Sequence, residues 1–243
     1  VYYVIALALY MQVSYREVLR CLLEGVRWLM GPEAQIKVAG KSGISQARQR
    51  LGSAPVRELH DRLVGPLAVP GTKGAWYRQW RLVSLDGSTM AVADTAQNEA
   101  AFGRPSQSRG QAAYPLLRFV SLVESGTHVL FGSRMAAYRV GETTLAKEVI
   151  PRLRRGMLCL ADRNFLGFEF WQQARGYGAE LLWRAKTALV LPCLQRFPDG
   201  SYLSRMYPSA EHRRRNTKGV PVRVIEYTVE GVADAEPLYR LVT

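Results

Sequence analysis

Apolar side chains recur at helical spacing through residues 1–30, which predicts helical structure over that range. Ser14, with Glu17 three residues later, matches a capping box, so we expect a second helix to begin there. Gly31 and Pro32 are expected to end that helix. The apolar positions fall on two faces: Val4, Leu7, Ala8 and Met11, and then Val18, Leu19, Leu22, Leu23 and Val26.

Two further helices are expected before residue 65. One begins at Ser42 or Ser45 and runs through Leu51, and the other covers Val56–Val64 after the break at 52–55. One interpretation is a helix-turn-helix with polar side chains facing DNA; we favour the other, a helical bundle, because the pair carries no base-reading signature. The side chains that would face DNA are Gln46, Arg48, Gln49 and Arg50.

Residues 69–74 form a Gly- and Pro-containing linker, after which the apolar spacing changes from helical to strand-like. Asp86-Gly87-Ser88-Thr89 is predicted to be a tight turn, residues 94–112 a polar loop, and 212–215 a basic loop. Helices are expected at 141–153 and Phe168–Arg175. Strands are expected at Arg81–Asp86, Met90–Ala93, Leu116–Leu122, Thr127–Met135, Met157–Ala161, Leu181–Arg184, Cys193–Phe197, Tyr202–Met206 and Val222–Val229.

The composition fits a folded protein with a substantial core. The chain has 243 residues, 48% hydrophobic and 22% charged, which excludes a mainly disordered or collagen-like chain. Its longest apolar run, Val1–Met11, is short of the ~20 residues that span a bilayer. Three distant cysteines without a C-x-x-C pair argue against a disulfide scaffold and favour a reducing compartment. The chain begins and ends within apolar patterns, so we expect both ends to be truncations.

The charge points to a polyanionic partner. The formal charge is +13 and the isoelectric point is near 10, a balance most often seen in proteins that bind nucleic acid. Most of the basic residues are arginine, whose planar fork makes paired hydrogen bonds to phosphate. The alternative is an arginine-biased composition that supplies surface charge alone, and the sequence leaves both open.

Two apolar strands each stop at an aspartate, at Asp86 and at Asp162. The predicted order is strand with Asp, two or three strands, helix, strand with Asp, helix, strand, which is the order of an RNase H-like fold. In that fold the two Asp-bearing strands are neighbours, so the two carboxylates would lie close together. Either aspartate alone would be read as a turn former or helix cap, but the pair on a basic chain favours a site.

Paired carboxylates repel each other unless a cation lies between them. Hard oxygen ligands favour Mg²⁺, for which Mn²⁺ can substitute. Two such ions can activate an attacking oxygen and stabilise the leaving oxygen at a phosphodiester. The sequence therefore predicts metal-assisted phosphoryl transfer on a polyanion, with Asp86 and Asp162 as ligands and catalytic residues.

Further stretches resemble bacterial insertion-sequence transposases with a DDE catalytic core, of the insertion-sequence-four family. The helical region carries one such stretch and the core carries the rest, and together they extend over most of the chain. They are Ser14–Leu19, Asp86-Gly87, Asp94-Thr95 with Asn98, Ala101–Pro105, Gly126–His128, Tyr138–Glu142, Leu160–Phe165 and Pro198–Leu203.

The resemblance implies an α/β fold with three parts: an N-terminal helical region (1–68), an RNase H-like mixed sheet flanked by helices (75–188), and a β-rich insertion (189–243). It implies binding of the element's terminal inverted repeats, DNA cleavage there, and strand transfer to target DNA by a Mg²⁺-dependent homodimer in the bacterial cytoplasm. Asp86 and Asp162 match the first two catalytic carboxylates. We predict DNA contacts for Arg163, Arg48, Arg50 and Arg104.

One departure concerns the third carboxylate. The family places it in a helix with the pattern Tyr, two residues, Arg, three residues, Glu, six residues, Lys, and no glutamate of this chain has that spacing. We expect the pattern beyond Thr243, and we expect this chain by itself to bind DNA weakly and not to transpose. Glu142 is interpreted as a first-turn helix residue rather than a ligand. Two alternatives remain: an RNase H-like nuclease without end preference, and a non-catalytic DNA-binding remnant.

Overall fold

The computed structural model describes residues 1–31, 33, 40–107, 110–111 and 114–243. These divide into two compact units, Val1–Leu63 and Val64–Thr243, each considered by itself. Pro32 of the predicted helix stop, and part of the predicted loop up to Ala112, lie outside the described residues.

The first unit is helical, as the sequence predicts. Its helices are α1 (Tyr2–Leu9), α2 (Tyr15–Met30), α3 (Lys41–Leu51) and α4 (Ala54–Leu63). The predicted helix start at Ser14 is confirmed, because its Oγ accepts the Glu17 N–H at 3.3 Å. Gly52, with φ +65°, ends α3 in a backbone conformation that glycine adopts without strain.

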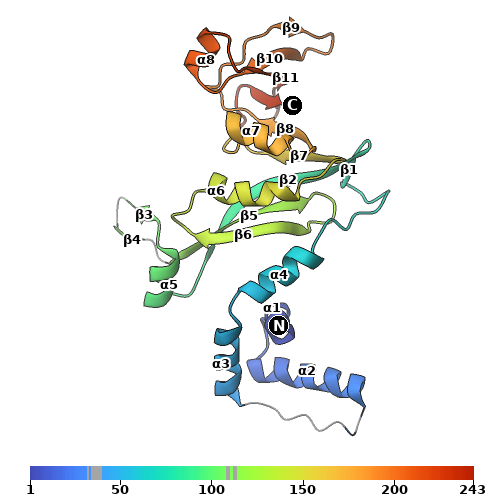
Figure 1. Cartoon of the computed structure of the whole chain (residues 1–243), viewed down its shortest axis with the longest axis vertical. Coiled ribbons are helices and arrows are strands. Elements are labelled where there is room, and N and C mark those ends of the chain that lie inside the picture. The colour runs from blue at the N-terminus through green and yellow to red at the C-terminus, as the bar shows by residue number, and fades with distance from the viewer. Residues whose placement is uncertain (32, 34–39, 108–109, 112–113) are drawn as a thin grey trace. The chain divides into compact units, whose positions relative to one another are not determined.

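The second unit is built on one large mixed sheet, so the coarse α/β prediction is confirmed (Figure 1). Its strand order is β6-β5-β2-β7-β8-β12-β11-β10-β9, with β1 (Trp76–Tyr77) paired to β2 off this path. β2, β7 and β8 run parallel, and all the other pairs are antiparallel. The strands are β2 (Trp80–Ala91), β5 (Leu116–Glu124), β6 (Leu130–Ala137), β7 (Met157–Ala161), β8 (Glu180–Arg184), β9 (Gln195–Arg196), β10 (Tyr202–Met206), β11 (Val220–Tyr227) and β12 (Tyr239–Val242).

The predicted turn at Asp86-Gly87-Ser88-Thr89 is wrong. β2 is continuous from Trp80 to Ala91 and pairs with β5 from Val83–Glu124 to Ala91–Leu116. The Asp-Gly signal favours a turn locally, but an unbroken ladder along a long neighbour satisfies the backbone of these residues instead. Residues 90–93 are therefore not a separate hairpin strand.

Two predicted loops contain short helices. The polar stretch after β2 includes α5 (Ala96–Phe102), which begins where Thr95 Oγ1 accepts the Asn98 N–H at 3.2 Å; the two-residue strands β3 (Ser106–Gln107) and β4 (Gly110–Gln111) follow it. The basic stretch 212–215 overlaps α8 (Ala210–Arg214), capped by Ser209, whose Oγ accepts the His212 N–H at 3.3 Å. In both places a hydroxyl cap starts a helix inside a polar run.

The core lies on one face of the sheet, under α6 (Glu142–Val149) and α7 (Phe168–Arg175), and α6 crosses the sheet near β5 and β6 (Figure 1). The 3₁₀ turn η1 (Ile150–Arg152) follows α6. Each helix buries residues on one side: Leu145, Ala146 and Val149 in α6, and Phe170, Trp171 and Ala174 in α7. Trp171 packs edge-on against Trp183 of β8, with ring centroids 5.2 Å apart.

The strands from residue 189 onward continue the same sheet, because β12 pairs with β8 through Leu241–Arg184 and Val242–Trp183. The outer edge of β8 is therefore paired, and the β12-β11-β10-β9 meander extends the sheet beyond it. None of the helices in the described part of the chain is long and apolar enough to cross a membrane.

Candidate metal centre

Asp86 and Asp162 sit at equivalent positions on neighbouring parallel strands. The register of β2 and β7 ends with the pair Leu85–Ala161, and each aspartate is the next residue. The predicted adjacency of the two Asp-bearing strands is therefore confirmed. Parallel strands lie ~4.8 Å apart, so the two backbones bring these carboxylates to one short stretch of the sheet.

Asp86 belongs to the face of the sheet opposite α6 and α7. Val83 and Leu85 are buried in the core, so the alternation of the strand directs Ser84 and Asp86 to the other face. Ala161 pairs with Leu85 on one side and with Trp183 on the other. Asp86, Asp162 and Arg184 are the next residues of the three segments, with Asp162 just after the end of β7.

Backbone N–H groups hold both carboxylates. Asp86 Oδ1 accepts the Gly87 N–H at 2.8 Å, and Asp162 Oδ1 accepts the Asn164 N–H at 2.5 Å. The second bond is an Asx turn, which directs the chain away from the end of β7. Both side chains are exposed, so their oxygens can be reached from solvent.

The donor chemistry fits a magnesium-type ion, since carboxylate oxygens are its preferred protein ligands. Magnesium keeps several waters and is held through one or two carboxylates, a demand that Asp86 and Asp162 meet. Among the residues that the structure describes, no three His, Cys, Asp or Glu side chains gather closely enough to hold a metal. The described part of the chain thus supplies two carboxylates to the candidate centre.

Glu142 lies beside this stretch but on the helix-covered side of β2. It occupies the first turn of α6, as predicted. A Cβ added to Gly87 would come within 2.7 Å of Glu142 Cγ and Cδ, so the glutamate fills the space above this glycine. Gly87 alternates with Asp86, which places Glu142 across the sheet from the Asp86 carboxylate.

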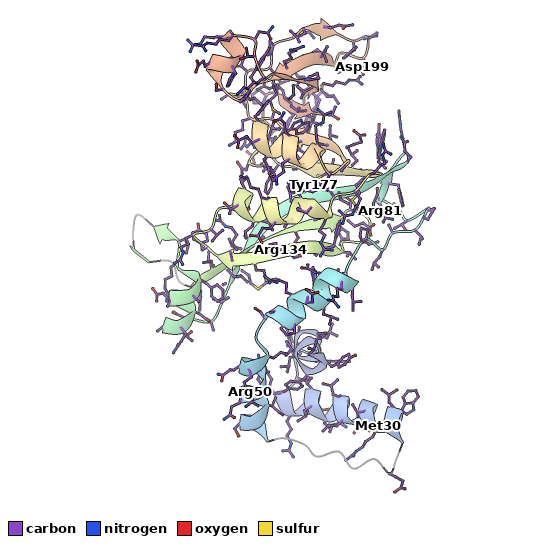
Figure 2. All side chains as sticks on the ribbon, in the orientation of Figure 1. Met30, Arg50, Arg81, Arg134, Tyr177 and Asp199 are labelled. Carbon is purple, nitrogen blue, oxygen red and sulfur yellow. The ribbon has the colours of Figure 1, made fainter. Side chains whose placement is uncertain are left out.

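Three of the four arginines predicted to contact DNA, namely Arg104, Arg48 and Arg163, engage other side chains of the chain, and Arg50 is exposed. Arg104 pairs with Asp94 and with Glu99 (3.2 Å). The Arg48 guanidinium lies 5.6 Å from the centroid of the Tyr15 ring. Arg50, labelled in Figure 2, is exposed in the last turn of α3. Their roles toward DNA stay predictions.

Arg163 meets a residue whose role the sequence did not reveal. Glu236 Oε1 lies 2.6 Å from Arg163 Nη1, and Glu236 Oε2 lies 2.8 Å from Arg184 Nη2. The hydrogen bond and charge of Arg184, together with the charge of Arg163, hold the pKa of the Glu236 carboxyl below its usual range despite partial burial. The only sequence signal was a glutamate shortly before a strand, 73 residues from Arg163.

Glu124 is a second residue that the sequence did not single out. It is fully buried at the end of β5, where its carboxylate pairs with Arg81 and accepts the Thr127 hydroxyl. Glu124 Oε2 also accepts the backbone N–H groups of Leu67 (2.9 Å) and Ala68 (2.8 Å). Figure 2 labels Arg81, near the start of β2. Burial raises the pKa of Glu124, but these hydrogen bonds outweigh it and leave the pKa lowered.

Comparison with known proteins shows which proteins the chain is similar to. Residues 1–61 match the family described as "Insertion element 4 transposase N-terminal". The chain is similar to "Putative transposase InsZ" of Escherichia coli (strain K12), 30% identical over 135 residues, which are 55% of this chain and 45% of that protein. It is also similar to "Transposase InsG for insertion sequence element IS4" of the same strain, 30% identical over 124 residues, which are 51% of this chain and 28% of that protein.

Both of these relatives are named as transposases, one of them as putative. The chain is similar to insertion-sequence-four transposases, which confirms the resemblance found in the sequence. The matched regions cover less than half of the length of either relative.

Proposed function

We propose that this chain is the DNA-binding and metal-binding front portion of a DDE transposase that cuts and joins DNA at the ends of its element. The observation that carries the proposal is the register of β2 and β7, which brings Asp86 and Asp162 to neighbouring positions where both side chains are exposed. Similarity to transposases supports the DNA substrate.

The arrangement of strands supports an RNase H-like core. The strands β6-β5-β2-β7-β8 follow one another in the sheet, with β5 antiparallel to β2 and with β7 and β8 parallel to it. The two neighbours of β2 thus run in opposite directions, and the parallel side carries both aspartates. We propose that β9–β12 are the insertion within this core.

When bound, magnesium supplies stabilisation of negative charge on the oxygens of a phosphodiester. Asp86 and Asp162 would hold it, from β2 and from the end of β7. Because both side chains are exposed, a DNA strand could approach them. With two carboxylates in the described residues, we propose that this part of the protein binds metal and DNA without cutting the strand.

The whole protein's partners follow from the same proposal: the terminal inverted repeats, a target DNA, and a second copy of the protein on the paired ends. A formal charge of +13 gives the chain the electrostatic attraction that phosphate contacts need. Much of this attraction is independent of base sequence, so random duplex DNA is a suitable first probe.

The test measures binding of a fluorescent duplex in EDTA and in Mg²⁺ at matched ionic strength. Substitutions Asp86→Asn and Asp162→Asn should bind at least as tightly as the wild type in EDTA, since each removes a charge that repels phosphate. In Mg²⁺ the wild type should gain affinity relative to both variants. The control, Glu230→Gln, removes one exposed carboxylate elsewhere and should follow the wild type in Mg²⁺. Equal responses to Mg²⁺ in all four proteins would contradict the proposal.

A further inference from the structure

We propose that Arg163 and Arg184 form a binding site for one phosphodiester group of DNA, and that the Glu236 carboxylate occupies this site when DNA is absent. The inference rests on the proposed function and specifies one contact within it. The three residues come from three segments: the loop after β7, the strand β8, and the segment before β12.

The two guanidinium groups are spaced for a single anion with two oxygens. One oxygen of Glu236 faces Arg163 at 2.6 Å, and the other faces Arg184 at 2.8 Å. A phosphodiester presents two non-bridging oxygens that bind arginine in the same manner as a carboxylate. The carboxylate therefore stands where a phosphate group can be received.

Arg184 stays in place without Glu236. It is anchored on a central strand, and its guanidinium lies 4.6 Å from the centroid of the Tyr239 ring. Tyr239 in turn stacks on Tyr227, with centroids 5.1 Å apart and rings inclined by 16°. Because the Arg184 side chain is fixed in this way, the site keeps much of its geometry when the Glu236 carboxylate leaves.

Glu236 is able to leave. It belongs to the irregular segment between β11 and β12, and its side chain is 33% exposed in its two ion pairs. Partly exposed ion pairs contribute less stability than buried ones, because water screens them. Replacing the carboxylate by a phosphate keeps both arginines paired, so the exchange leaves no buried charge alone.

The position of the site agrees with its proposed ligand. Arg163 directly follows Asp162, and Arg184 directly follows Trp183, which pairs with Ala161. A phosphate held by the two arginines would therefore lie beside the aspartate pair. The two arginines would bind one phosphate of the DNA strand, and a neighbouring phosphate of the same strand would lie at the metal ligands.

The test compares Glu236→Gln with Glu230→Gln, which removes the same charge from the same segment. Binding of a fluorescent random-sequence duplex is measured in EDTA, so that the outcome does not depend on the metal centre. We expect E236Q to bind about fivefold more tightly than E230Q, because a competitor for the arginines is gone. Arg163→Ala should reduce the affinity more in the E236Q background than in the wild type.

Equal affinities of E236Q and E230Q, or the same loss from Arg163→Ala in both backgrounds, would overturn the proposal. If inorganic phosphate raises the thermal midpoint of E236Q while duplex affinity is unchanged, the site takes a free anion, and the proposal also fails.

Circular dichroism checks that the variants fold. Should E236Q not fold, Glu236→Asp withdraws the carboxylate by one methylene and should show a smaller rise. If the wild type binds no duplex at all, the proposed function fails rather than the exchange.

Discussion

Leu85 of β2 pairs with Ala161 of β7 at the last matched position of these two parallel strands. The next residues are Asp86 and Asp162, which both lie just beyond the last matched pair. After them the two segments follow different paths. β2 continues along β5 to Ala91, whereas the chain turns away after β7. The Asp86 carboxylate thus lies within a continuous strand, and the Asp162 carboxylate lies at the first residue of a loop.

Substitution Glu124→Gln should destabilise the second unit by about 3 kcal/mol. The change leaves Arg81 partly buried without its charge partner and weakens the bonds from Leu67 and Ala68. Urea unfolding monitored by tryptophan fluorescence measures the effect. Glu148→Gln, which removes an exposed carboxylate 3.7 Å from Arg134, is the control and should stay within about 0.5 kcal/mol of the wild type. Equal losses from the two substitutions would refute the role of Glu124.

The same carboxylate should make stability depend on acid. Its folded-state pKa is lowered, so its contribution is fully present above the unfolded pKa and is lost as the pH falls through the folded pKa. As the pH falls below 4.5, the ordinary pKa of a glutamate carboxyl, the wild type should lose more free energy of unfolding than E124Q. Unfolding curves at a series of acidic pH values test this, and parallel losses in both proteins would contradict it.

Two glycines should respond differently to alanine. A Cβ at Gly126 would lie 2.6 Å from the Ala75 N and 2.7 Å from the Lys73 O, so backbone would have to shift. Gly126→Ala should cost about 2 kcal/mol. The nearest atoms to a Cβ at Gly87 all belong to the Glu142 side chain, which can rotate away, so Gly87→Ala should remain within about 1 kcal/mol of the wild type. Thermal melts rank the two, and the reverse order would be the contradicting result.

The Cys159 thiol should be unreactive in the folded protein. It is fully buried in β7, and burial raises its pKa to about 12, which suppresses the reactive thiolate. Cys21 and Cys193 are exposed and should react with Ellman's reagent at once. Adding denaturant should release the third thiol. Immediate reaction of all three without denaturant would show that β7 is not a buried central strand.

Some of this arrangement could be predicted from the sequence. Apolar runs ending at Asp86 and Asp162 predicted two buried strands, because a strand buried on both faces is a near-continuous apolar run. The order of the predicted elements then predicted that the two strands are neighbours. The helix cap at Ser14 could likewise be predicted, because Ser14 and Glu17 alone match the capping pattern. The continuation of β2 through Gly87 was not, because its cause lies in pairing with β5, a strand that is distant along the chain.

The polar partnerships were also hidden. Glu124 binds Arg81 across 43 positions, and Glu236 binds Arg163 across 73. Glu124 begins a polar stretch that resembles an ordinary turn, and Glu236 stands between an alanine and a proline. Only the folded sheet shows that one carboxylate is buried and that the other joins two arginines next to the aspartate pair.

The most direct measurement for the central claim is Mn²⁺ binding, followed by electron paramagnetic resonance, to the wild type, D86N, D162N and E230Q. If the two aspartates share one ion, each asparagine substitution should raise the Kd at least about tenfold, and the double variant should add little to either single one. E230Q should bind as the wild type does. Unchanged affinity in D86N and D162N would contradict the assignment of Asp86 and Asp162 as a metal centre.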